Sequence, residues 1–178
     1  MPGGERHCQP NGKSGQYTGL YAAGFNNRSL LLQLDSTKPD AKEVWRDKQN
    51  VICAVNVQPL VVGNILYGFD QKGVMRAIQI PEGKRLWEST APIGKRPADS
   101  STAFIVQHED RFVMFNELGE LLLAKLSPEG YTEIDRAKVI DQTNNAYGRE
   151  VVWSMPAFAN KHAYIRNDKE IICVDLAK

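Results

Sequence analysis

The sequence contains few cysteines and histidines, and its net charge is close to zero. Its 178 residues include three cysteines and three histidines, and 22 Lys and Arg stand against 21 Asp and Glu. Nucleic-acid binding needs Lys and Arg clustered on one face, but here these residues are scattered among the predicted turns. We therefore expect no nucleic-acid partner.

The spacing of the three cysteines does not indicate a disulfide framework. Cys8, Cys53 and Cys173 are odd in number and far apart, so their spacing specifies neither a disulfide pattern nor a zinc knuckle. Cys53 and Cys173 lie in apolar, strand-like runs, and we expect both to be small core residues. Cys8 lies in a polar segment, where an exposed thiol is expected.

Long apolar runs are also lacking. The most apolar stretch, residues 51–69, is interrupted by Asn56, Gln58, Pro59 and Asn64, which makes it too polar to span a bilayer and predicts two strands instead. Residues 1–8 contain no apolar signal core. We expect no membrane span and no signal peptide within this sequence.

What the sequence does contain is a repeat. The segment 66–88 recurs in weaker form on both sides, and an apolar residue closes the third predicted strand of each unit. These closing residues follow one another at intervals of 46, 46 and 50 residues and are Leu34, Ile80, Leu126 and Leu176. A period in the forties with strand-like units is typical of propeller blades, whereas helical repeats have a 3.6-residue period.

Each unit reads as strands separated by polar turns. In the clearest copy, strands at 65–69 and 74–80 flank the turn 70–73, and a third strand follows at 85–88. Asp at the start of a turn bonds its own backbone, and Gly at its end tolerates positive φ, so this turn suits a hairpin. The other copies repeat the pattern. Their predicted strands are 20–25, 29–34 and 43–46; 112–115, 120–126 and from 131; and 156–159, 162–166 and 170–176.

The predicted fold is all-β, a partial or open β-propeller of about four antiparallel four-stranded blades. Residues 1–19 are expected to be a flexible lead-in or the remnant of a preceding blade, although the innermost strand of the first blade should lie near 12–18. The predicted blades occupy residues 20–50, 51–98, 99–145 and 146–178. The last has three strands.

The segment 77–88 resembles the pyrroloquinoline-quinone-like (PQQ-like) repeat, which has an alanine, apolar positions, a turn and an apolar-Trp pair, here Leu86 and Trp87. The ending 173–176 is similar to the same element cut short. Over residues 20–178 the chain is most similar to the C-terminal blades of propeller proteins with this repeat from planctomycete-type bacteria. Such rings close with roughly seven or eight blades, and the N-terminal segment often supplies the last outer strand. The resemblance thus implies open sheet edges here, through which self-association is one expectation.

The resemblance also implies a periplasmic or extracellular location, with any signal in an upstream region. Quinoprotein dehydrogenases of this superfamily hold the quinone with calcium, acidic and amide ligands and, in many members, a pair of adjacent cysteines. This sequence has no adjacent cysteine pair, and no acidic cluster matches those ligands. We expect no cofactor, and PQQ with calcium only if the chain is part of such a dehydrogenase.

The candidate catalytic residues lack partners at useful spacing. His7, His108 and His162 are far apart, and none has a second ligand at metal spacing. The acidic groups at 109–110 and 168–170 fall in predicted turns, where solvated charge is the default, whereas general acid–base chemistry needs a pocket that shifts the pKa of the catalytic group. We predict no catalytic, cofactor-binding or metal-binding residue.

Two further sets have structural explanations that we favour. Ser100–Thr102 would supply a nucleophile only beside a base, and the sequence identifies none; it more simply leads into a strand at 103–107. Trp45, Trp87 and Trp153 resemble a ligand-stacking set, but Trp45 and Trp87 occupy equivalent outer-strand positions. Packing between blades is the better explanation for those two.

Three functions remain open at this point. The first is a non-catalytic propeller module that binds a protein or a carbohydrate. The second is the C-terminal part of a PQQ-dependent dehydrogenase. The third is a scaffold resembling the outer-membrane assembly lipoprotein propellers, which bind extended peptides at strand edges. The fold alone does not choose among them, because function depends on the site that a fold carries.

Overall fold

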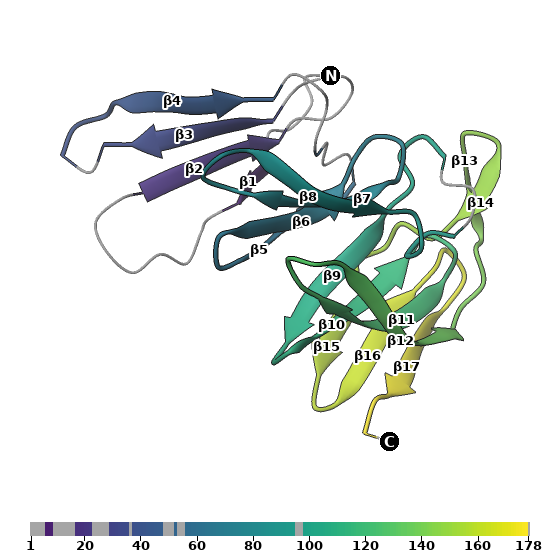
Figure 1. The fold of residues 1–178 in the computed structure, drawn as a ribbon. Helices are drawn as coiled ribbons and strands as arrows, with labels where there is room; N and C mark the ends of the chain where they lie inside the picture. The colour runs from purple at the N-terminus through teal and green to yellow at the C-terminus, as the bar shows by residue number, and fades with distance from the viewer. Residues whose placement is uncertain are drawn as a thin grey trace.

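The structure is a computed structural model, which describes residues 6–8, 17–22, 29–35, 37–47, 52, 56–94 and 98–177. The regular elements of these residues are all strands, arranged in four antiparallel sheets and a short hairpin (Figure 1). We call the four sheets blades 1 to 4, in chain order. None of the described residues belongs to a helix that could cross a membrane.

The strands of each blade pair in sequence order. Blade 1 contains β1 (Arg6–Cys8), β2 (Tyr17–Ala22), β3 (Leu30–Leu34) and β4 (Ala41–Arg46). Blade 2 contains β5 (Leu60–Val62), β6 (Ile65–Phe69), β7 (Met75–Gln79) and β8 (Lys84–Ser89). Blade 3 contains β9 (Ala103–His108), β10 (Arg111–Asn116), β11 (Glu120–Leu126) and β12 (Tyr131–Lys138). Blade 4 contains β15 (Ala157–Ala159), β16 (His162–Arg166) and β17 (Ile171–Asp175), and the hairpin contains β13 (Asn144–Ala146) and β14 (Arg149–Val151).

Blade 1 differs from the prediction. Its first strand is β1, which pairs with β2, whereas the sequence placed that strand near residues 12–18 and assigned residues 1–19 to a lead-in or the remnant of a preceding blade. β1 has three residues, Arg-His-Cys, too few to show the alternation of apolar and polar residues that marks a half-buried strand. In blade 4, by contrast, three strands are present, and within the described chain β17 pairs with β16 alone.

The hairpin β13–β14 was not predicted and straddles the expected blade boundary at 145/146. Tyr147 and Gly148 form its tip, and both have positive φ, 53° and 75°, as a two-residue type I′ turn requires. The hairpin lies in the connection between blades 3 and 4, residues 139–156, which we call the 139–156 connection. This insertion lies within the 50-residue interval of the repeat, which is longer than the other two.

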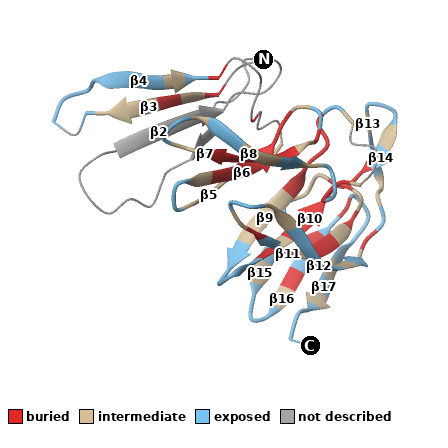
Figure 2. Ribbon diagram, viewed as in Figure 1, coloured by how far each residue is buried: buried red, intermediate tan, exposed pale blue. Residues whose placement is uncertain are grey.

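The core lies between the blades, because successive residues of a strand face opposite sides of its sheet. In β6, Leu66 packs in a cluster with Leu31 of blade 1. The next residue, Tyr67, packs in a second cluster with Phe112 of blade 3. A third cluster joins blades 3 and 4 through Phe115, Leu121, Ala163 and Ile165. Burial is greatest in the middle strands, and the outer strands β4 and β12 are largely exposed (Figure 2).

A β-bulge marks the outer strand of every four-stranded blade. The pairing skips one residue in each case, and the skipped residues are Val44, Leu86 and Ile134. The residue after the bulge is Trp45 in blade 1 and Trp87 in blade 2, but Asp135 in blade 3. A bulge changes the direction in which the neighbouring side chain points. Here it directs the two tryptophans toward the next blade.

Both tryptophans bridge to the following blade. The indole N–H of Trp45 donates to the carbonyl of Ile80 at 2.7 Å, and that of Trp87 donates to the carbonyl of Ser127 at 2.8 Å. The Trp45 ring also lies against Gly83, where an added Cβ would be 3.0 Å from the ring. The predicted packing role of Trp45 and Trp87 is therefore confirmed.

In blades 2, 3 and 4, the turns between the second and third strands follow one design. Each begins with a buried Asp or Asn whose Oδ1 accepts two backbone N–H groups of its own turn, and these residues are Asp70, Asn116 and Asn167. The two asparagines also donate from Nδ2 at 3.0 Å, to the carbonyls of Pro92 and Asp141. Side chain to backbone bonds of this kind favour turns. In blades 3 and 4, the bonds from Asn116 and Asn167 also fix the turn against the connection that enters its blade.

Candidate binding site on the turn face

The turns of blades 2, 3 and 4 and the connections that follow blades 2 and 3 lie at one end of the blades, which we call the turn face. The second residue of each turn is polar: Gln71 in blade 2, Glu117 in blade 3 and Asp168 in blade 4. Gln71 and Asp168 each line a pocket, and Glu117 is 2 % exposed. The same position of the repeat thus contributes to the turn face in three successive blades.

The carboxylate of Glu117 is the centre of a buried polar cluster. It accepts hydrogen bonds from Ser101 Oγ at 2.7 Å and from the indole N–H of Trp153 at 2.9 Å. Arg149 donates to both of its oxygens, from Nε and Nη2, each at 3.2 Å. A buried carboxylate is stable only when it is paired and hydrogen-bonded, and this arrangement provides both.

The backbone of the same turn holds the 139–156 connection at two places. The carbonyl of Gly119 accepts the N–H groups of Val139 and Ile140 at 3.0 and 3.3 Å. The carbonyl of Glu117 accepts the N–H of Val152 at 2.8 Å. The hairpin β13–β14 lies between these two anchoring points, so the turn 116–119 fixes both ends of the segment that carries it.

The connection presents aromatic, cationic and sulfur-containing side chains. Tyr147 at the hairpin tip and Met155 are each 67 % exposed. The rings of Tyr147 and Trp153 are tilted, with centroids 6.3 Å apart, and the guanidinium of Arg149 lies 6.0 and 5.8 Å from them. These distances permit cation–π attraction. The exposed ring of Tyr147 therefore packs beside the guanidinium of Arg149, which Glu117 holds in place.

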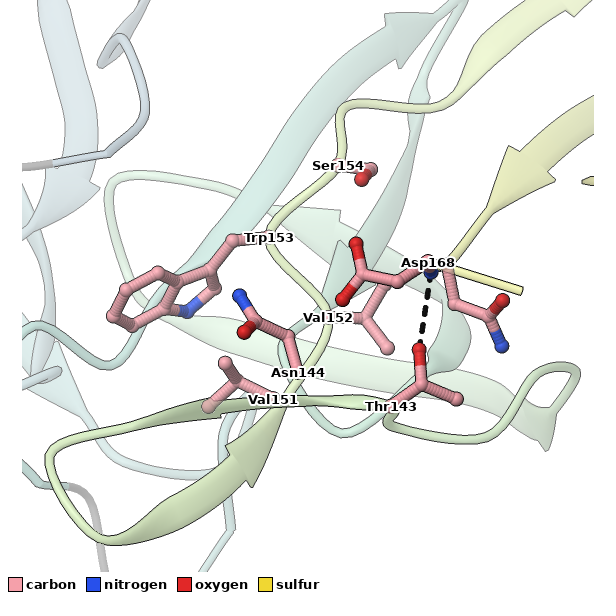
Figure 3. A pocket seen from close by; sticks show the side chains of 8 residues that line it. Thr143, Asn144, Val151, Val152, Trp153, Ser154 and Asp168 are labelled. Carbon is pink, nitrogen blue, oxygen red and sulfur yellow. Dashed lines mark hydrogen bonds between the residues drawn. The ribbon is translucent and has the colours of Figure 1, made fainter. Parts of the chain in front are cut away.

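Two pockets open on the turn face. The larger has a volume of about 410 Å³, and its lining residues are Gln71, Ala98, Asp99, Ser100, Tyr147 and Arg149. The smaller, of about 70 Å³, lies between the 139–156 connection and the turn of blade 4. Figure 3 shows Trp153 on one side of it and Asp168 with Thr143 on the other, where the Asp168 N–H donates to Thr143 Oγ1 at 3.0 Å.

A second polar cluster on blade 3 has a structural role. Arg136 donates to Glu120 at 2.7 Å, to Glu133 at 2.8 Å and to the carbonyl of Ala91 at 2.8 Å. The hydrogen bond from Arg136 holds the pKa of Glu133 below its usual value, and burial raises the pKa of Tyr131. The cluster ties β12 to the connection that enters its blade.

The structure does not assemble the other candidate residues into a site. His108, Glu109 and Asp110 are exposed around the β9–β10 turn, at the opposite end of β10 from Glu117. His162 begins β16, with its Nδ1 2.7 Å from the carbonyl oxygen of Asn160. The side chain of His7 lies outside the described residues. Over the described ranges, no three His, Cys, Asp or Glu side chains gather as a metal site.

The serine segment is buried beside Glu117 and leads into β9. Ser101 is 2 % exposed, and its hydroxyl donates to Glu117. This contact does not form a nucleophile–base pair, because Arg149 already neutralises the carboxylate and neither group is accessible to a substrate. The role of Ser101 here is to satisfy Glu117.

The prediction for Cys173 is wrong. Its thiol is free and exposed, because Ile172 and Val174, the residues on either side of it, face the cluster between blades 3 and 4. The alternation of β17 therefore directs Cys173 outward with Ile171. Cys53 and the side chain of Cys8 lie outside the described residues.

Sequence reasoning missed Glu117, Arg149 and Tyr147. Alignment of the repeat turns gives one usable signal, since it places Glu117 at the position of Gln71 and Asp168. No comparable signal exists for Arg149 and Tyr147, because they belong to an insertion that is not repeated in the described residues of the other connections.

The comparisons with known proteins bear on the fold. No protein-family model matches the chain, and no curated protein matches it. Solved structures do match. BamB from Moraxella catarrhalis aligns over 92 % of this chain and 41 % of its own, with 13 % identity and a TM-score of 0.53. The chain has the β-propeller fold.

Two further propeller neighbours support this conclusion. A chain of the Mitotic Checkpoint Complex aligns over 88 % of this chain and 44 % of its own, with 14 % identity and a TM-score of 0.54. The quinohemoprotein alcohol dehydrogenase ADHIIG from Pseudomonas putida HK5 aligns over 83 % and 26 %, with 18 % identity and a TM-score of 0.51. The chain thus spans less than half the length of these propellers, and the likeness concerns the fold alone.

Proposed function

We propose that the chain is a non-catalytic β-propeller module that binds a protein partner through the 139–156 connection. The observation that carries the proposal is the exposure of Tyr147 and Met155 on a segment that the buried Glu117 holds in place. Tyr, Trp, Met and Arg are enriched at the centres of protein interfaces. A segment already fixed before binding loses less conformational entropy when the partner arrives.

The polar chemistry of the turn face supports binding over catalysis. Glu117 is the buried carboxylate nearest to a candidate nucleophile, and its oxygens accept four hydrogen bonds. A general base needs a free lone pair within reach of a substrate proton, which Glu117 does not offer. One propeller neighbour belongs to the Mitotic Checkpoint Complex, an assembly of the kind that a scaffold role would involve. For location we keep the periplasmic or extracellular setting that the repeat resemblance implies.

The proposal can be tested by site-specific photocrosslinking. A photoreactive amino acid at position 155 should crosslink a partner in the native host, whereas the same group at position 171, where Ile171 is 72 % exposed on blade 4, should not. The captured protein is then purified and its Kd measured. Met155→Asp should weaken binding about 30-fold, the effect of a typical hot-spot residue.

Ile171→Asp is the matched control and should leave the Kd unchanged. If Met155→Asp and Ile171→Asp weaken binding equally, or if neither does, the 139–156 connection is not the interface and the proposal fails.

The alternative is that the chain forms part of a PQQ-dependent dehydrogenase. One neighbour is a quinohemoprotein, but the described residues do not fit the quinone with calcium, because they bring together no acidic cluster and the sequence has no adjacent cysteines. We expect titration with PQQ and Ca²⁺ to give only the summed absorbance of protein and quinone. A saturable change in the visible spectrum would contradict this and support the dehydrogenase.

A further inference from the structure

We propose that the larger pocket of the turn face binds a neutral, polyhydroxylated ligand, such as one sugar unit of a glycan. This inference goes beyond the protein-binding role and does not depend on it. It rests on the charge balance of the pocket, its unused hydrogen-bonding groups, the exposed ring of Tyr147 and the shape of the lining.

The charges that line the pocket are already paired. Arg149 contacts Glu117 at 3.2 Å, and Asp99 contacts Lys72 at 2.6 Å. The pocket therefore offers no net charge to a ligand. A phosphate, a carboxylate or an ammonium group would have to break an existing ion pair to gain one, whereas a neutral ligand leaves both pairs intact.

Hydrogen-bonding capacity nevertheless remains at the edge of the pocket. Within the described residues, Arg149 donates its hydrogen bonds from Nε and Nη2, and the Asp99 carboxylate accepts through Oδ1. Arg149 Nη1 is left as a donor and Asp99 Oδ2 as an acceptor. Hydroxyl groups both donate and accept, so a ligand with several hydroxyls can satisfy both positions at once.

Tyr147 supplies the apolar part of the site. Its ring lies at the hairpin tip, is 67 % exposed and contacts Arg149. A sugar ring combines a flat face of C–H groups with hydroxyls at its rim, which matches an aromatic surface placed beside polar side chains. A purely apolar ligand would leave the Arg149 and Asp99 groups desolvated and unpaired.

The shape of the pocket favours a compact ligand over an extended peptide. Of the lining residues, only Arg149 belongs to a strand, and the others come from a turn, a loop and the hairpin tip. Strand addition needs the open edge of a sheet, which this lining does not provide. Its volume of about 410 Å³ falls within the roughly 300–1,000 Å³ typical of small-ligand sites.

Saturation-transfer NMR on the full chain tests the inference, with glucose, galactose and N-acetylglucosamine as neutral probes and acetate and lysine amide as ionic ones. At least one sugar should bind in preference to both ions, and it should perturb the Tyr147 ring signals. Tyr147→Asn removes the ring while suiting the positive φ of this position, and it should weaken binding about tenfold. Tyr147→Phe should retain it.

Tyr164→Ala is the matched control, because Tyr164 is also exposed but lies on β16, and it should bind like the wild type. Met155→Asp should keep sugar binding even if it abolishes partner binding, which separates this inference from the proposed function. The inference is overturned if no sugar binds, if an ionic probe binds in preference, or if Tyr147→Asn binds as well as Tyr147→Phe.

Discussion

Gly119→Ala is expected to destabilise the protein by about 4 kcal/mol, which is exceptional for the addition of one methyl group. The new Cβ would lie 2.0 Å from the carbonyl oxygen of Ile140, a distance that no unstrained structure permits. The φ of Gly119 is also +78°, where an L-residue is strained. Relief of the contact requires the turn and the 139–156 connection to move apart, which breaks the bonds from Val139 and Ile140 to the Gly119 carbonyl.

Gly148→Ala provides the matched control. Gly148 has nearly the same φ, +75°, but an added Cβ would have no neighbour within 4 Å. Its substitution should therefore cost only the backbone strain, about 1–2 kcal/mol. Urea unfolding of the two variants measures the difference, read from the midpoint at an unchanged m-value. Equal losses would show that the close approach of Gly119 to Ile140 does not exist in solution.

Glu117→Ala is expected to cost about 3–5 kcal/mol, the range for removal of one partner from a buried ion pair. The substitution leaves the guanidinium of Arg149 without its counter-charge, and it removes the acceptor for Ser101 and Trp153. For a protein of this size, a loss near 3 kcal/mol lowers the Tm by roughly 6–12 °C. Differential scanning calorimetry measures the shift.

Two comparisons make the Glu117 prediction specific. Glu129→Ala removes an exposed glutamate from the turn after β11 and should change stability by no more than about 0.5 kcal/mol. Glu117→Ala combined with Arg149→Met should lose less than the sum of the single variants, because the second change removes the unpaired charge. A Glu117→Ala loss as small as that of Glu129→Ala would contradict the buried cluster.

The sequence predicted the parts of the fold that repeat. The closing residues from Leu34 to Leu176 revealed the blade period because each blade must place an apolar residue at the same point of its sheet. The turns beginning at Asp70 and Asn116 were recognisable because a side-chain acceptor and a glycine are needed at fixed positions. Trp45 and Trp87 were interpreted correctly for the same reason, since equivalent positions make equivalent contacts.

The candidate site was not predictable, because it arises where the repeat is broken. Glu117 and Arg149 are 32 residues apart in sequence, and they meet only because the hairpin β13–β14 folds back on the turn of blade 3. The two strands of that hairpin have three residues each, too short for a periodic signal. The prediction that Cys173 is a core residue failed for a different reason. An apolar neighbourhood in sequence does not reveal which face of a strand a residue occupies.

The central claim is that the turn 116–119 holds the 139–156 connection as a fixed surface, and amide hydrogen exchange measures this most directly. The N–H groups of Val139, Ile140 and Val152 donate to that turn, so they should be protected in the wild-type protein. In Glu117→Ala, protection should fall selectively at Val152 while the amides of blade 2 are unchanged. Exchange of these three wild-type amides at the rate of an unfolded peptide would contradict the account.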